Sequence, residues 1–162
     1  MSDQIETRLK TLGITLPDLV APVANYVPWV ISGNLVFISG QITVENGELA
    51  YVGKLGDSVS TEVGVRAANL CARNLLAQLK AACGGDLNRV SRVVKLGGFV
   101  NCTAEFTDQP KVINGASDLM VEVFGDAGRH ARAAVGVASL PLGVASLPLG
   151  VSVEIDAVFE ID

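Results

Sequence analysis

The final twelve residues place the strongest restriction on the fold. From Val151 to Asp162, apolar side chains alternate with side chains that are mostly acidic. An alternation with a period of two is typical of a β-strand that has one face in the core and the other face open. We therefore predict a terminal strand, and its buried face carries Val151, Val153, Ile155, Ala157, Phe159 and Ile161.

Further strands are predicted near the N-terminus. YVPWVI at 26–31 and LVFISGQI at 35–42 are rich in β-branched and aromatic residues, and the turn sequence Ser-Gly-Asn at 32–34 separates them. This arrangement predicts a hairpin. Asn46-Gly47 is another strong hairpin signal, and it leads into ELAYVGKL at 48–55, which we interpret as a third strand.

Two amphipathic helices are predicted in the middle of the chain. Ser60 and Thr61 are N-cap residues, and they precede apolar positions that recur every three or four residues until Gly84-Gly85. The second helix begins after a cap at residue 107 or 108 and ends at Gly125. Residues 90–100 between the helices predict a strand, in which Gly97-Gly98 marks a bulge or the close approach of another backbone.

This order of elements predicts an α+β fold, a mixed β-sheet with two helices packed on one face. The other face of the sheet needs cover because the chain has many apolar strand positions and few charges, so we expect symmetry mates to supply it. Residues 1–19, which contain a short helix ended by Gly13, are interpreted as an N-terminal extension. Residues 20–162 are interpreted as one domain.

The composition excludes several function classes. Apolar residues make up 49% of the 162 positions, which excludes a disordered chain. Charged residues make up only 18%, below the roughly 25% usual for soluble domains, so we expect a subunit interface. The formal net charge of −5 has the wrong sign for a surface that binds nucleic acid. One histidine and three widely spaced cysteines cannot assemble a Cys/His metal site within one chain. The polar N-terminus and the odd cysteine count predict reduced thiols and a cytoplasmic protein.

One uncharged run has the length of a membrane-spanning helix. It covers 21 residues at 133–153, and much of it is a tandem repeat, GVASLPL at 136–142 and again at 143–149. Three glycines and two prolines interrupt the run, so we predict no membrane span. We interpret the repeat as an enlarged loop between two strands; the alternatives are longer strands, a blocked cleft, or a shift of register that would turn Glu154 toward the core.

Two charged residues are candidates for chemistry because they lie in strand-like apolar sequence. Arg132 is a candidate anion clamp, since a guanidinium binds a carboxylate through two parallel hydrogen bonds. The alternative is a structural ion pair with Glu154 or Asp156 on a neighbouring strand. Glu154 is a candidate for holding water or accepting a proton from it, and the alternative is a solvated acid on an open sheet face.

Three weaker candidates have structural alternatives. Tyr26 begins a strand and can place a hydroxyl over a ligand, or it is an interface aromatic. Asn114 sits beside Gly115 in a predicted helix, a poor helix pair that suggests a functional role, although it can also be a surface polar residue. His130 is interpreted as structural or solvated, because no nucleophile signature lies near it in the sequence.

Over about residues 20–161 the chain resembles the Rid family of reactive-intermediate deaminases, also called the YjgF family. The segments that carry the resemblance are NYVPWV at 25–30, ISGQI at 38–42, VINGASDLMVEVFG at 112–125, HARAAVGVASLPLG at 130–143 and VSVEIDAV at 151–158. The segments RLKTLGITLP and FTDQPKVINGASDL are similar to a longer bacterial subgroup of that family.

The resemblance implies a chorismate-mutase-like fold that assembles as a homotrimer, with clefts between subunits and no metal or organic cofactor. Arg132 would hold the carboxylate of a 2-imino acid, and Glu154 would orient or activate the attacking water. The family often has a cysteine two residues after the arginine, where this chain has Ala134. The remaining pocket residues would be Tyr26, Ser39, Gly40, Asn114 and, through its backbone, Ala134.

The activity implied is hydrolysis of 2-imino acids or their enamine tautomers to 2-oxo acids and ammonia, as in a 2-iminobutanoate/2-iminopropanoate deaminase. Two alternatives stay open. One is a non-catalytic trimer that senses small carboxylates, and the other is an endoribonuclease, a label that some relatives carry and that the acidic balance disfavours.

Overall fold

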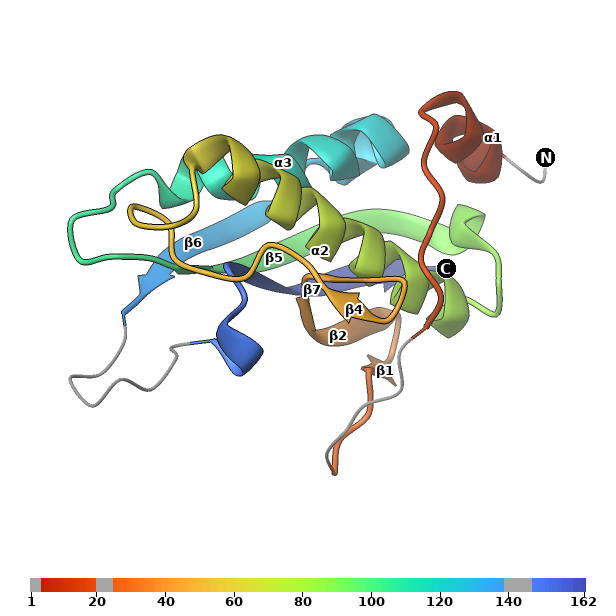
Figure 1. The fold of residues 1–162 in the computed structure, drawn as a ribbon. Helices are drawn as coiled ribbons and strands as arrows, with labels where there is room; N and C mark the ends of the chain where they lie inside the picture. Colours follow the sequence, from red (N-terminus) through yellow and green to blue (C-terminus); the bar gives the residue numbers. More distant parts are fainter. Residues whose placement is uncertain (1–3, 20–24, 139–146) are drawn as a thin grey trace.

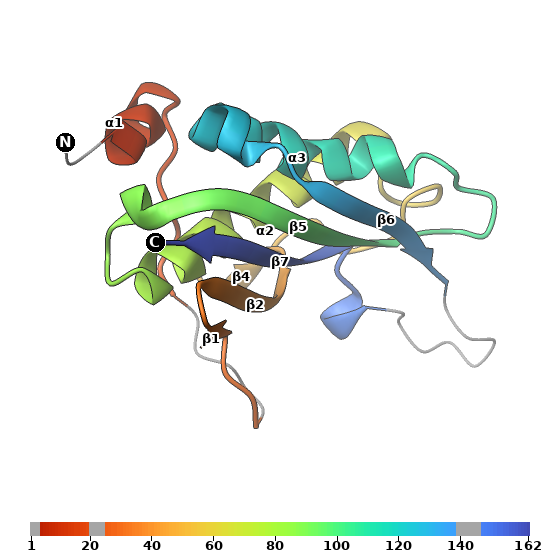
Figure 2. The same ribbon diagram turned by 180° about the vertical axis from the view of Figure 1, so that it is seen from behind.

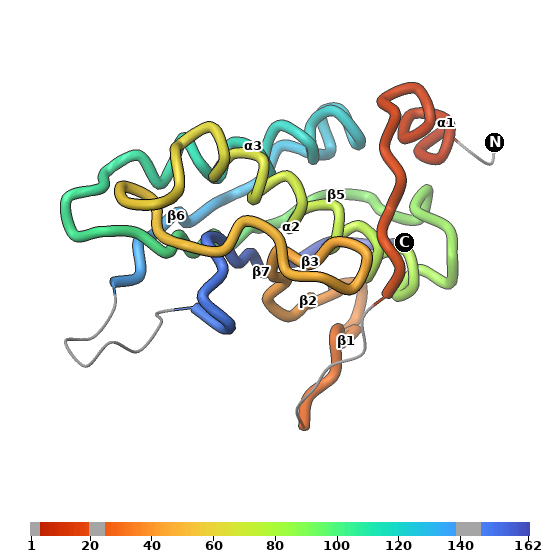
Figure 3. Tube along the Cα trace, viewed as in Figure 1, coloured from red at the N-terminus to blue at the C-terminus, as the bar shows by residue number. Residues whose placement is uncertain are grey.

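A mixed five-stranded sheet forms the centre of the computed structural model, which describes residues 4–19, 25–138 and 147–162. The strand order is β1 (Trp29–Ser32), β2 (Leu35–Ile42), β7 (Val153–Ile161), β5 (Val90–Asn101) and β6 (Ala131–Val137). Neighbouring strands are antiparallel except β5 and β6, which are parallel. The strands β1 and β6 are therefore the two edges of the sheet (Figure 3).

Two long helices cover one face of this sheet. They are α2 (Thr61–Ala82) and α3 (Gln109–Phe124), and the two opposite views show both on the same side of the strands (Figures 1 and 2). Ser60 caps α2 by accepting a hydrogen bond from the Val63 N–H, and Asp108 is the N-cap residue of α3 without a side-chain cap bond. This arrangement confirms the predicted α+β fold class.

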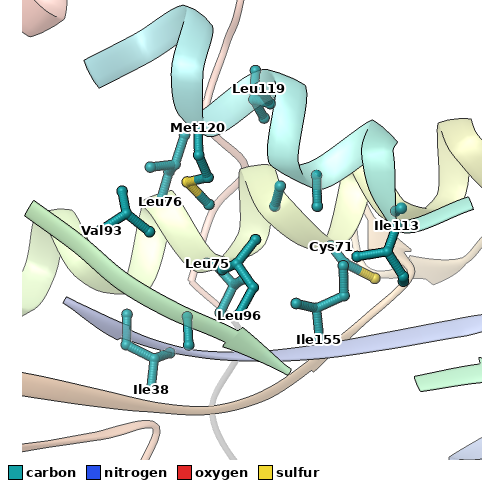
Figure 4. Packing of buried hydrophobic residues seen from close by; sticks show 14 of the residues in the cluster. Ile38, Cys71, Leu75, Leu76, Val93, Leu96, Ile113, Leu119, Met120 and Ile155 are labelled. Carbon is teal, nitrogen blue, oxygen red and sulfur yellow. The ribbon is translucent and has the colours of Figure 1, made fainter. Parts of the chain in front are cut away.

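The core lies between the sheet and the two helices. Leu75 of α2, Leu96 of β5 and Ile155 of β7 are fully buried there (Figure 4). The strand β7 confirms the predicted alternation, because its odd-numbered residues from Val153 to Ile161 are all buried. Burial of this apolar set is the main force that holds β7 in its register, since a slip by one residue would turn acidic side chains into the core.

A short N-terminal helix, α1 (Gln4–Thr11), packs beside the C-terminal end of α3 (Figure 1). Its Leu9 is buried in the core, and Nη1 of Arg8 donates to the carbonyl oxygen of Val123 over 3.2 Å. Glu6 forms an ion pair of 2.6 Å with Lys80 of α2. The helix is thus tied to the sheet-and-helix body, and the boundary at residue 19 stays a prediction.

The predicted third strand at 48–55 is wrong over most of its length. Only β4 (Glu48–Leu49) forms there, and it pairs with β3 (Val44–Glu45) as a separate hairpin. Tyr51, Gly53 and Gly56 have φ angles of 53°, 130° and 84°. These left-handed conformations break an extended chain, and apolar content alone does not reveal them.

The glycine pair in β5 also has a different role from the one predicted. The register shifts of β5 against β7 lie near Val93, not at Gly97-Gly98, so the pair is no bulge. A Cβ on Gly97 would overlap the Asp156 carboxylate, and a Cβ on Gly98 would overlap the Ile113 side chain of α3. Side chains and not another backbone therefore approach β5 at this point.

The face of the sheet opposite the helices is partly apolar and open. Phe37 of β2 lies opposite Val158 of β7 and Val30 of β1, and both Phe37 and Val30 are exposed. A hollow of about 340 Å³ lies there, with Lys95 and Asp156 also on its wall. Cover by symmetry mates stays a prediction.

The loop predicted at the tandem repeat falls largely on residues 139–146, which lie outside the described residues. On its two sides, β6 ends at Val137 and a short turn of helix, η3, spans Pro148–Gly150. Among the described residues, no helix has the length and apolar character needed to cross a membrane.

Candidate active site

Arg132 lies on the edge strand β6 and reaches toward α3. Its Nη1 donates to Oδ1 of Asn114 over 2.8 Å and to Oγ of Ser117 over 3.1 Å, and its Nη2 donates to the Pro110 carbonyl oxygen over 3.3 Å. All three acceptors are neutral. Within residues 4–19, 25–138 and 147–162, no carboxylate forms an ion pair with this guanidinium.

The structural ion pair between Arg132 and Glu154 or Asp156, which the sequence left open, is therefore not formed. The physical reason is the strand order: β5 lies between β6 and β7, so Arg132 and Glu154 are not on neighbouring strands. A guanidinium has five N–H donors, and three of them are used by the acceptors from α3. The Nε proton and one Nη2 proton have no acceptor in the described part of the chain, and these two nitrogens form the edge of the group that pairs side-on with a carboxylate.

Asn114 holds the guanidinium from an exposed position on α3, and its neighbour Gly115 has a packing role. A Cβ on Gly115 would overlap the backbone carbonyl of Val65, so the glycine allows α3 to approach α2 closely. Helix packing thus explains the glycine of the Asn-Gly pair, and the bond to Arg132 explains the asparagine.

Glu154 is half-buried on β7, and its side chain points away from the helices because its neighbours Val153 and Ile155 are fully buried beneath them. Desolvation raises the pKa of Glu154, and the nearby negative charge of Asp156 raises it further. A carboxylate with a raised pKa is a better proton acceptor once it is ionised. Its location therefore suits a residue that takes a proton from water.

Gly40 lies directly against this carboxylate, because a Cβ at position 40 would overlap Oε1 of Glu154. The pairing of β2 with β7 shifts register between Ile38 and Gln41, and the shift places Ser39 and Gly40 in a bulge. Only a residue without a side chain lets the β2 backbone come this close to Glu154.

Ser39 connects the bulge to the segment that carries Tyr26. The Ser39 hydroxyl donates to the Val27 carbonyl oxygen over 2.9 Å, and the Ser39 N–H donates to the Pro28 carbonyl oxygen over 2.9 Å. Tyr26 itself is 52% exposed. The described contacts of Ser39 thus hold the chain near Tyr26 beside the bulge and leave the aromatic ring free to meet a ligand or another chain.

The predicted site residues form two groups. The arginine group is Arg132 with Asn114 and Ala134; Ala134 lies opposite Gly98, whose α-carbon faces Ile113 of α3. The glutamate group is Glu154 with Gly40, Ser39 and Tyr26. In the described part of the chain, no hydrogen bond or ion pair joins the two groups.

Sequence reasoning missed Ser117, which contacts both Arg132 and His130. Oγ of Ser117 lies 3.0 Å from Nε2 of His130, so the histidine does have a hydroxyl beside it. A signal for Ser117 was present, because positions 114 and 117 are three residues apart and share one face of a helix. No cluster of three or more His, Cys, Asp or Glu side chains that could hold a metal ion occurs among the described residues.

Comparison with known sequences identifies the family. Residues 6–151 match the family described as "YjgF/chorismate mutase-like, putative endoribonuclease". This chain belongs to the YjgF family. The resemblance to the YjgF or Rid family that the sequence suggested is thereby confirmed.

Three similar proteins span nearly the whole length of this YjgF family member. Protein TCP17 of Trypanosoma cruzi is 46% identical over 162 residues, which are 99% of this chain and 96% of TCP17. The crystal structure of Atu1372 from Agrobacterium tumefaciens, a protein of unknown function, is 56% identical with a TM-score of 0.86, covering 98% of this chain and 92% of that one. A protein of Shewanella oneidensis named a putative endoribonuclease is 35% identical with a TM-score of 0.88, covering 98% of this chain and 100% of that one.

Proposed function

We propose that this YjgF family protein hydrolyses 2-imino acids, or their enamine tautomers, to 2-oxo acids and ammonia. The observation that carries the proposal is the state of Arg132. Its guanidinium is exposed, it is held only by neutral acceptors, and it keeps two N–H donors without an acceptor in the described part of the chain. This is the arrangement expected of a group that receives a carboxylate from outside the chain.

The reaction needs few groups, because an imine carbon is already electrophilic. Arg132 would bind the substrate carboxylate through its Nε and Nη2 edge and so fix the position of the C=N carbon. Glu154 would take one proton from a water molecule while that water attacks the carbon. The proton would pass from Glu154 to the nitrogen, which gives a carbinolamine. The carbinolamine hydroxyl would then lose its own proton to the nitrogen through the same carboxylate, and the C–N bond would break as the C=O bond forms, which releases the 2-oxo acid and ammonia. The raised pKa of Glu154 supports this role, since the same carboxyl must both accept and return the proton.

The separation of the two groups supports a site shared between chains. The arginine group lies at the β6 edge of the sheet, whereas the glutamate group lies on β7 and β2, with β5 between them. We propose that the protein is a cytoplasmic homotrimer and that the β6 edge of one subunit meets the glutamate group of the next. Such contact would also cover exposed apolar side chains, among them Phe37 of β2 and Val135 of β6.

In this arrangement the remaining predicted residues have supporting roles. Tyr26 would close the pocket, Ser39 and Gly40 would line it beside the water, and Asn114 would steady the guanidinium. Ala134 would offer backbone groups where other family members have a cysteine.

An assay of imine decay tests the activity. A threonine dehydratase would generate 2-iminobutanoate, and the wild type should speed its loss whereas Arg132→Ala should not. Equal decay with both proteins would reject the proposal. Binding of 2-oxobutanoate without any effect on imine decay would instead favour the non-catalytic carboxylate sensor.

Mixed trimers test the shared site. Arg132→Ala and Glu154→Gln chains, each inactive alone, would be refolded together in equal amounts. With random mixing, about a quarter of the clefts then combine an intact Arg132 with an intact Glu154 from different chains, so about a quarter of wild-type activity should return. The control mixes Arg132→Ala chains with the double variant, in which no cleft is complete and no activity should return. Absence of recovery in the first mixture would place both residues in the same chain's site.

The family description and the Shewanella relative make RNA cleavage the second candidate. The net charge of −5 argues against a phosphate-binding surface. An RNA-binding measurement across a range of salt concentrations separates the two functions. Binding that weakens steeply with salt, together with RNA cleavage lost in Arg132→Ala, would favour the nuclease over the deaminase.

A further inference from the structure

The single histidine of the chain lies beside the proposed carboxylate site. His130 directly precedes β6 and follows η2 (Gly125–Gly128), a turn of helix after α3. Its Nδ1 is 2.6 Å from the carbonyl oxygen of Gly128, and its Nε2 is 3.0 Å from Oγ of Ser117. That same Oγ is 3.1 Å from Nη1 of Arg132. A continuous line of hydrogen bonds therefore runs from the guanidinium to the backbone of η2.

For a neutral imidazole, the chemistry of the groups gives the direction of every bond in this line. A backbone carbonyl only accepts, so Nδ1 of His130 must carry a proton and donate to Gly128. In a neutral imidazole the other nitrogen then has no proton, so Nε2 accepts from the Ser117 hydroxyl. With its proton committed to the histidine, Oγ of Ser117 turns a lone pair toward Arg132, whose N–H groups only donate.

We propose that Ser117 and His130 are positioning residues that hold Arg132 in the orientation which receives the carboxylate. The inference rests on the proposed function of Arg132. An arginine side chain has many rotamers, and each bond to a fixed acceptor removes some of that freedom before the substrate arrives. Asn114 fixes one proton of Nη1, and Ser117 fixes the other, so together they set the plane of the guanidinium.

His130 is needed in this arrangement because a serine hydroxyl on a helix has an alternative hydrogen-bond acceptor. It can turn and donate to a backbone carbonyl of the preceding helical turn. Nε2 of His130 draws the hydroxyl proton away from the helix, and the bond from Nδ1 to Gly128 keeps the ring in the required tautomer. His130 thus orients the Ser117 hydroxyl, and the Ser117 hydroxyl orients the Arg132 guanidinium.

The same contacts make Ser117 a poor nucleophile. The second partner of the histidine is the neutral carbonyl of Gly128 and not a carboxylate, so the pair lacks the acidic member of a catalytic triad. The Arg132 N–H also occupies one of the two lone pairs of the hydroxyl oxygen. Orientation of Arg132 is therefore the role that fits the geometry of the pair.

Binding and turnover of matched variants test the proposal. Calorimetry would give the Kd for 2-oxobutanoate, and the imine assay would give kcat and KM. Ser117→Ala should raise Kd and KM about tenfold, the effect of losing one hydrogen bond to a charged group, and leave kcat within about twofold. Ser117→Thr keeps the hydroxyl and should restore near wild-type values.

Two substitutions of His130 test the roles of Nδ1 and Nε2 separately. Glutamine can place an acceptor near the position of Nε2, so His130→Gln should keep most of the affinity. Asparagine can place a donor near the position of Nδ1 but offers no acceptor to Ser117, so His130→Asn should behave like Ser117→Ala. Urea unfolding of all four variants would show that each one is folded.

Nitrogen NMR of the imidazole supplies a readout that needs no ligand, and the chain has a single histidine to observe. The neutral ring should show the proton on Nδ1, and the Nε2 signal should change in Ser117→Ala and not in Ser117→Thr. A proton on Nε2, or wild-type Kd in Ser117→Ala, would overturn the positioning role while leaving the deaminase proposal intact. A wild type that binds 2-oxobutanoate without turnover would overturn the deaminase proposal alone, and a wild type that binds no 2-oxo acid would overturn both.

Discussion

The arginine group and the glutamate group are built in opposite ways. Arg132 is exposed on an edge strand, and oxygens from one helix hold it. Glu154 is half-buried on an inner strand, between β2 and β5, with the Gly40 backbone against its carboxylate. Arg132 has only neutral hydrogen-bond partners in the described part of the chain. Burial and the charge of Asp156 both raise the pKa of Glu154, so its carboxyl group is harder to ionise.

The two charged groups also share one feature, which is that neither has an ion-pair partner in the described part of the chain. A charge that is removed from water is costly unless an opposite charge or hydrogen bonds compensate it. Neither Arg132 nor Glu154 forms an ion pair in the described part of the chain, although the chain contains enough opposite charges to pair both. In the proposed function, the exposed Arg132 would receive an anion and the half-buried Glu154 would receive a proton.

The largest expected effect comes from removing the guanidinium. Arg132→Ala should lower kcat/KM for a 2-imino acid by at least about a hundredfold, since a two-point charged contact is lost. Arg132→Lys should recover only part of it, because an ammonium lacks the fork that matches a carboxylate. The matched control is Arg129→Ala, which removes an exposed arginine that pairs with Asp126 over 3.5 Å and should change kcat/KM by less than about twofold. Equal losses at 129 and 132 would mean that general positive charge, and not the built site, attracts the substrate.

A methyl group placed beside Glu154 or beside Asp156 gives the next effect. Gly40→Ala places a Cβ against Oε1 of Glu154, and Gly97→Ala places one against Oδ1 of Asp156. Both changes crowd a packed sheet and should cost about 1–3 kcal/mol of stability. Only Gly40→Ala moves the proposed base, so it alone should lower kcat by about tenfold, measured at saturating substrate. A similar kcat for the two variants would remove Glu154 from the chemistry.

The pH profile of kcat/KM offers a smaller effect that is specific to the glutamate group. Glu154 must be ionised to accept a proton, and its pKa is raised by desolvation and then by the charge of Asp156. Asp156→Asn removes that second cause, so the pKa of Glu154 should fall and the acidic limb of the profile should move to lower pH. Asn114→Ala, in the arginine group, should lower kcat/KM at every pH without moving the limb. A limb that stays in place in Asp156→Asn would show that another group controls it.

The spacing of apolar residues predicted most helices and strands, because the buried face of each element repeats at a regular interval along the sequence. The alternation along β7 and the three- and four-residue spacing of α2 both reflect which face meets the core. The failure at 48–55 has an equally local cause, because left-handed backbone at Tyr51 and Gly53 ends the extended conformation. Gly53 permits such a conformation, but a tyrosine gives no sign of it.

The arrangement of the candidate site depended on contacts that no local pattern encodes. Arg132 and Glu154 were predicted from their costly positions in apolar strands, yet the sequence did not show that β5 separates them, because strand pairing joins distant segments. The bond between Ser117 and His130 depends on how η2 returns the chain from α3 to β6. That turn has the sequence Gly-Asp-Ala-Gly, which predicts a turn but not the direction in which the chain leaves it.

The smallest effect is a difference between the two groups in how stability depends on pH. Burial raises the pKa of Glu154 in the folded chain, so the folded state binds its proton more tightly than the unfolded state does. This carboxyl therefore lowers the stability as the pH rises from the ordinary glutamate pKa through the raised value. Glu154→Gln should flatten the fall in unfolding free energy that begins at the ordinary glutamate pKa and continues above it, measured by urea unfolding. The change should be small because solvent screens a half-exposed group. Arg132→Gln should leave the slope unchanged, since a guanidinium stays protonated over that whole range; a slope that responds to Arg132 and not to Glu154 would reverse the assignment of the two groups.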